Sequence, residues 1–162
     1  MTTDCSPRLF ASDAAIRRVG EGLLARTLPR PEWTHEAHLA ACLWLLRERP
    51  DIDAPAELPS IIASYNEAVG GENTDTAGYH ETITQAYIRL IGAYLAAHDR
   101  GQPLADMVNA LLASPLGHRD ALLAYYSRDR LFSIEARKRW MEPDLAPFPS
   151  HAAGAEAVAA LG

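Results

Sequence analysis

Cysteine is scarce in this 162-residue chain, which contains only Cys5 and Cys42. Two thiols so placed form neither a disulfide framework nor a metal-thiolate pattern, so a reducing compartment is expected. Long apolar runs are missing too, since the longest, LAACLWLL, is too short to span a bilayer. The start MTTDCSPRLF lacks the apolar region of a secretory signal. We therefore expect a cytoplasmic protein without a membrane segment.

A basic stripe is also absent. The chain has 15 Lys and Arg against 21 Asp and Glu, well mixed along the sequence, and its net charge is -6. Binding to nucleic acid or to an anionic membrane needs clustered positive charge, and both are disfavoured here. A small molecule is the partner that we expect.

No strand pattern persists along the chain. Apolar residues recur at spacings of three and four, and Pro and Gly clusters separate these segments. The pattern predicts an all-α fold, a single-domain bundle of about six to seven helices over residues 1–149 with an extended Pro-rich segment, MEPDLAPFP, near its end. The Ala-rich residues 150–162 form a separate tail, as frayed helix or disorder.

Capping residues and stop signals predict where the helices lie. The expected starts are Ser12 or Asp13, the residue after Thr34, the residue after Asp53, Tyr79, Pro103, Arg119 and the residue after Ser133. The helix from Tyr79 to about His98 is the longest, and we expect it to form the spine of the fold.

Helical periodicity indicates which side chains face the core. On the helix that starts near Tyr79, the core stripe contains His80, Thr84 and Tyr87, and Thr82 lies opposite. On the helix after Thr34, His35 and His38 face the core. Trp44 lies on the outer side, where it either packs under another helix or marks the contact of a homodimer.

His35 and His38 are spaced to share one bound atom, since side chains at i and i+3 lie on one helix face. Short connections make successive helices antiparallel, so the helices that begin near His35 and His80 should run parallel and start at the same end of the bundle. Three neutral imidazoles would suit Zn(II), Fe(II), Mn(II) or Ni(II). The alternative for His38 is packing against Trp33, which precedes the helix, as a hydrophobic staple.

Further candidates surround this expected site. Glu81 is a fourth metal ligand or an acid/base, or an acid of the first helical turn that the helix dipole stabilises. We assign Tyr65 a catalytic role, with a core aromatic that walls the pocket as the alternative. Asn66, Thr84, Tyr87 and His118 are expected in the substrate pocket, although Asn66 can instead cap the local backbone.

The motifs WTHEAH, NTDTAGYHET, YYS followed by SIEARKRW, and EPDL together resemble a bacterial family of small helical proteins. The resemblance spans most of the chain, from the helix after Thr34 to Asp144. It implies no activity, so the expected site depends on spacing and facing alone.

Three functions remain open from the sequence. The first is an enzyme in which His35, His38 and His80 hold one divalent metal, with hydrolase and oxygenase chemistry undecided. The second is a metal-free protein that binds a small molecule in an apolar pocket. The third is an interaction module that engages a protein partner through PDLAPFP or the Trp44 face.

Overall fold

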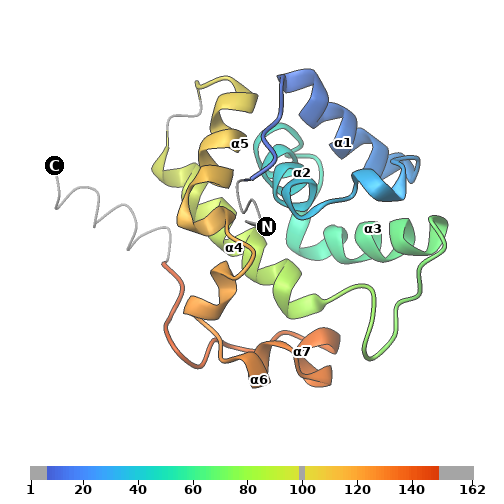
Figure 1. The fold of residues 1–162 in the computed structure, drawn as a ribbon, viewed down its shortest axis with the longest axis vertical. Coiled ribbons are helices and arrows are strands. Elements are labelled where there is room, and N and C mark those ends of the chain that lie inside the picture. Colours follow the sequence, from blue (N-terminus) through green and yellow to red (C-terminus); the bar gives the residue numbers. More distant parts are fainter. Residues whose placement is uncertain (1–6, 99–100, 150–162) are drawn as a thin grey trace, which may run out of the picture.

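The structure is a computed structural model and describes residues 7–98 and 101–149. These ranges contain α-helices and short 3-10 turns and no strand, which confirms the predicted all-helical class (Figure 1). The expected tail at 150–162 lies outside the described residues. The helices are α1 (Asp13–Ala25), α2 (His35–Glu48), α3 (Ala54–Ala68), α4 (Glu81–Ala97), α5 (Leu104–Ala113), α6 (Arg128–Leu131) and α7 (Ile134–Lys138).

Most helix starts are set by the side chains that the sequence indicated. Ser12, Thr34, Asp53 and Ser133 each accept a hydrogen bond from the backbone N–H three residues ahead. This bond satisfies one of the N–H groups that the first turn of a helix leaves without a partner. Local sequence is therefore enough to place these four boundaries.

The second half of the chain is more broken than predicted. The helix expected from Arg119 is a 3-10 turn at Ala121–Ala124, followed by the short α6. After α7, residues 140–149 contain neither helix nor strand, as their prolines require. In the described part of the chain, no helix is both long enough and apolar enough to cross a membrane.

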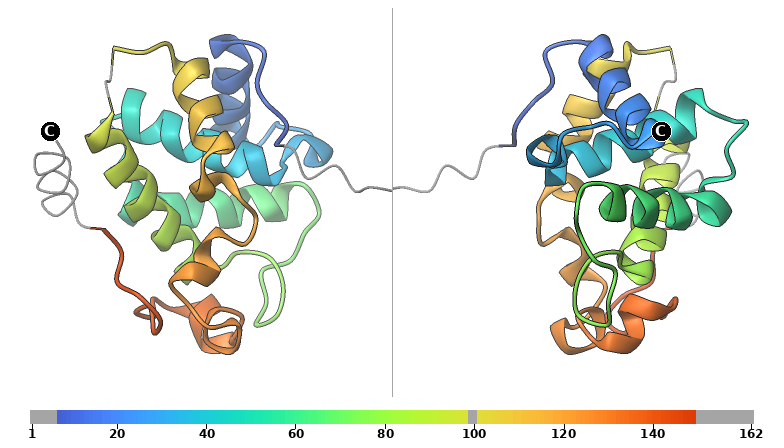
Figure 2. Two further views of the ribbon diagram at one scale, coloured as in Figure 1. Left: turned by 60° about the vertical axis from the view of Figure 1, so that its left-hand side comes forward. Right: turned by 90° about the vertical axis from the view of Figure 1, so that its right-hand side faces the viewer.

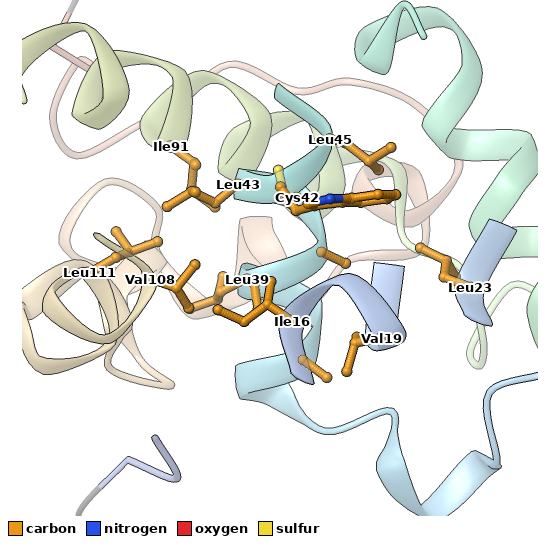
Figure 3. Packing of buried hydrophobic residues seen from close by; sticks show 14 of the residues in the cluster. Ile16, Val19, Leu23, Leu39, Cys42, Leu43, Leu45, Ile91, Val108 and Leu111 are labelled. Atoms are coloured by element: carbon orange, nitrogen blue, oxygen red, sulfur yellow. The ribbon is translucent and has the colours of Figure 1, made fainter. Parts of the chain in front are cut away.

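Helix α2 lies at the centre of the main core. Figure 3 shows its side chains Leu39 and Leu43 between Ile16 of α1 and Ile91 of α4. Trp44 is buried beneath α1, because a Cβ on Gly20 would stand only 2.2 Å from the Trp44 ring. Trp44 therefore packs under another helix, which is the first of its two predicted roles. A homodimer stays a prediction, but Trp44 does not form its contact.

Helices α2 and α4 cross obliquely instead of lying strictly parallel. Figure 1 looks almost along the axis of α2, whereas α4 lies across that view, and the two helices also cross obliquely in Figure 2. Their first turns still lie close together, because His35 and His38 of α2 border the same cavity as Ile83 and Thr84 of α4.

Helix α4 is covered on two faces. Ile91 and Leu95 join the main core, while Ala86 and Leu90 pack with residues of the C-terminal region, Leu122, Tyr126 and Leu131, in a second core. Thr82 was expected to face solvent but is fully buried, where its hydroxyl donates to Arg139 O at 2.8 Å. Segment 139–141 covers this face, which the helical pattern alone did not show.

Candidate functional site

A cavity of about 290 Å³ lies where α2, α3 and α4 meet. It is large enough for a small molecule, since a cavity of ~150 Å³ already holds benzene. Five of its lining residues carry polar groups: Trp33, His35, His38, Thr84 and Tyr87. The other seven are Leu23, Leu39, Ala41, Cys42, Leu58, Ile62 and Ile83. The cavity suits a compact, largely apolar molecule.

His38 occupies the wall of this cavity in a fixed orientation. Its ring stacks on Trp33 with centroids 3.8 Å apart, which is the staple that WTHEAH suggested. His38 Nδ1 lies 2.7 Å from Thr34 O, and because a carbonyl only accepts, Nδ1 carries the proton. Nε2 then keeps its lone pair and has no partner among the described residues.

The His38 imidazole stays neutral over the usual pH range. The residue is exposed and lines the cavity, and the protein packed around its ring displaces part of the water that would solvate a charge. This desolvation lowers the pKa of His38 from 6.5 to about 4, with the nearby His35 acting in the same direction. Above about pH 5, therefore, His38 presents a lone pair and no charge.

His35 lines the same cavity one helical turn earlier. Its Nε2 lies 3.0 Å from Gly117 O and must donate to it, which leaves the Nδ1 lone pair unpartnered in the described structure. The ring packs edge-on to Tyr87, with centroids 6.4 Å apart. Two imidazole lone pairs thus come from adjacent turns of α2.

Tyr87, Thr84 and Cys42 complete the chemistry of the wall. Desolvation, followed by the charge of Asp120, raises the pKa of Tyr87 to about 12, so its phenol stays protonated. Burial likewise raises the pKa of the Cys42 thiol to about 12. Neither group is ionised near neutral pH, so both act as neutral wall groups.

His80 lies outside the cavity and serves as the N-cap of α4. Its Nδ1 accepts from Ile83 N at 3.1 Å, and its Nε2 donates to Leu131 O at 2.8 Å. The ring is buried, and desolvation is the main cause that lowers its pKa. Both nitrogens are occupied by backbone, so His80 has no lone pair free for a metal.

Glu81 points its carboxylate to neighbouring side chains. Oε1 accepts from the Tyr79 hydroxyl at 2.7 Å and from Gln85 Nε2 at 3.1 Å. Burial, and then the bond to Glu81, raises the pKa of Tyr79. This arrangement fits the first-turn acid that the sequence offered as one reading of Glu81.

Tyr65 and Asn66 stabilise the chain around the glycine-rich loop. The Tyr65 hydroxyl donates to Leu28 O at 2.8 Å, and Asn66 Nδ2 donates to Asn73 Oδ1 at 3.2 Å. Asn73 Oδ1 also accepts from Tyr79 N at 2.9 Å. Gly78 closes this loop at φ +82, where a Cβ would stand 2.2 Å from Glu72 O. Neither Tyr65 nor Asn66 lines the cavity between α2, α3 and α4.

His118 is exposed and lines a different hollow, together with Tyr94 and His98. Its Nδ1 accepts from Asp120 N at 3.1 Å. Of the residues predicted for the site, the structure thus brings together His35, His38, Thr84 and Tyr87, and it places His80, Glu81, Tyr65, Asn66 and His118 elsewhere.

No three His, Cys, Asp or Glu side chains of the described residues form a group that could hold a metal ion. The convergence predicted for His80 is not seen because its ring caps α4 through Ile83 N and donates to Leu131 O. A bound metal stays a prediction.

Sequence reasoning missed several parts of the site. Trp33 was expected only as a packing partner of His38, and Cys42 was not among the predicted site residues, yet both line the cavity. The motif WTHEAH contains the signal for Trp33, because a large aromatic before the N-cap reaches the fourth helical residue. No sequence signal identifies Cys42 as a cavity residue, because a residue that lines a cavity and a residue packed inside the core follow the same helical spacing.

Comparisons with family models, with curated proteins and with solved structures found no match.

Proposed function

We propose that this protein binds an uncharged small molecule in the cavity between α2, α3 and α4. The observation that supports it best is the cavity itself, about 290 Å³ with a mostly apolar wall and a few polar groups. Ligand pockets have this combination, with volumes from ~300 Å³ upward. Burying apolar ligand surface supplies the affinity, and the imidazoles of α2 orient the ligand.

A pair of matched variants tests whether the cavity is the binding place. Ile62 lines the cavity and Ile61 beside it does not, although both are half-buried residues of α3. Toluene at about ten times its dissociation constant should raise the melting temperature of the wild type by about 3–5 °C.

In Ile62→Trp the new side chain fills the cavity, and the shift with toluene should vanish. In Ile61→Trp the shift should remain. Equal shifts in both variants, or none in the wild type, would overturn the proposal.

A second candidate is a metal centre at His35 and His38, with water completing the coordination. Their unpartnered nitrogens, Nδ1 and Nε2, lie on adjacent turns of α2 and favour it. Elemental analysis of protein without a His-tag separates the two candidates. Near-stoichiometric Zn, Fe, Mn or Ni that disappears in His35→Ala, His38→Ala would establish the metal centre; metal-free protein with unchanged stability under chelation favours the small-molecule pocket.

A further inference from the structure

The cavity between α2, α3 and α4 offers no charged partner. In the part of the chain that the structure describes, its lining includes no Asp, Glu, Lys or Arg. An isolated ionised group loses several kcal/mol when it leaves water without a counter-charge. Carboxylates, phosphates and ammonium groups are therefore poorly matched to this cavity.

The hydrogen-bonding polarity of the wall is fixed by the backbone. Thr34 O holds the proton of His38 on Nδ1, and Gly117 O holds the proton of His35 on Nε2. The two remaining ring nitrogens can only accept. The hydroxyls of Thr84 and Tyr87 rotate and can donate or accept, so they adapt to the ligand.

Aromatic rings form part of the wall. Trp33 stacks on His38, and Tyr87 meets His35 edge-on. Such rings contact another ring favourably in stacked or edge-on geometry. The volume, about 290 Å³, is nearly twice the ~150 Å³ that holds benzene, so one substituted ring fits.

We infer that the ligand is an uncharged aromatic molecule with a hydroxyl group, a phenol in chemical class, whose O–H donates to His38 Nε2. This inference depends on the proposed binding function and names the ligand class for the same cavity. The phenol O–H supplies a hydrogen-bond donor to the unpartnered His38 Nε2. The aromatic ring of the phenol contacts the aliphatic wall of the cavity.

Two probes of nearly equal shape, 4-methylphenol and p-xylene, isolate the hydrogen bond. Dissociation constants are measured by NMR titration for the wild type and for His38→Phe, which keeps a ring beside Trp33 but has no lone pair. The ratio of the p-xylene constant to the 4-methylphenol constant should fall about 5- to 10-fold in His38→Phe. His35→Phe is the matched control one turn away, with a smaller change in the ratio.

A measurement on the wild type keeps the test independent of the folding of the variants. Binding of 4-methylphenol should shift the ¹⁵N resonance of His38 Nε2, and p-xylene should shift it much less. An unchanged ratio in His38→Phe, equal ¹⁵N shifts, or 4-methylbenzoate binding as tightly as 4-methylphenol would overturn the phenol inference and leave the cavity as a binding site. If neither p-xylene nor 4-methylphenol binds, the proposed function fails as well.

Discussion

His35, His38 and His80 each donate to a backbone carbonyl and differ in whether the second ring nitrogen has a backbone partner. His80 uses both nitrogens, one to cap α4 and one to hold Leu131 O. His38 and His35 each donate once to a carbonyl and keep a lone pair beside the cavity. A histidine with a free lone pair can meet a ligand, whereas one with two backbone partners stabilises the fold.

Replacing His80 should therefore cost stability. We expect His80→Ala to lower the free energy of unfolding by about 1–3 kcal/mol, since it removes a helix cap and a buried hydrogen bond. His80→Asn should recover part of the loss, because Asn is a good N-cap residue. Urea unfolding measures both.

His98→Ala is the control for His80. His98 lies at the other end of α4 and is exposed, with one bond to Tyr94 O, so its replacement should change stability by about 0.5 kcal/mol or less. Equal losses in His80→Ala and His98→Ala would contradict the capping role.

At the scale of the elements, the close packing of α1 on α2 depends on Gly20. Any Cβ at this position would overlap the Trp44 ring, with Cε3 only 2.2 Å away. The missing side chain lets the Trp44 indole bury its face against the α1 backbone, which a helical wheel of α2 alone cannot show.

Gly20→Ala should be destabilising even though Ala favours helix by about 1 kcal/mol over Gly. Overpacking against Trp44 should lower the free energy of unfolding by about 1–3 kcal/mol. The same substitution in a Trp44→Leu background should cost much less, because the ring is gone. A double-mutant cycle by urea unfolding measures this coupling; additive effects would show that the two residues do not compete for space.

At the scale of the whole molecule, desolvation of two imidazoles links folding to pH. The lowered pKa values of His38 and His80 mean that the folded protein binds fewer protons than the unfolded chain at mildly acidic pH. Their contribution is fully present above about pH 6.5 and is lost as the pH falls toward about 4. Carboxyl groups whose pKa is lowered by folding change the stability only at lower pH. The change in stability between pH 5 and 6.5 therefore reports on the histidines.

The free energy of unfolding should accordingly fall between pH 7 and pH 5. Urea unfolding across this range measures the slope, which should be shallower in His38→Gln and unchanged in His98→Gln. Stability that is constant or rising as the pH drops from 7 to 5 would show that the two imidazoles are not held neutral by folding.

The sequence by itself determined the helical class and the boundaries marked by Ser12, Thr34, Asp53 and Ser133, because caps and periodicity act over a few residues. It also indicated that Thr84 and Tyr87 would share a pocket with His35 and His38, since each helix turns its own stripe inward.

Only the tertiary structure decided which histidines meet. The bonds of His80 to Ile83 N and to Leu131 O set it apart from the cavity, and segment 139–141 covers the Thr82 face of α4. Periodicity indicates that a face is buried but does not identify the segment that buries it, and a non-helical segment such as 139–141 has no helical periodicity that would place it. The proton positions of His35 and His38 depend on carbonyls, one of them 82 residues away in the chain, so spacing alone could not assign them.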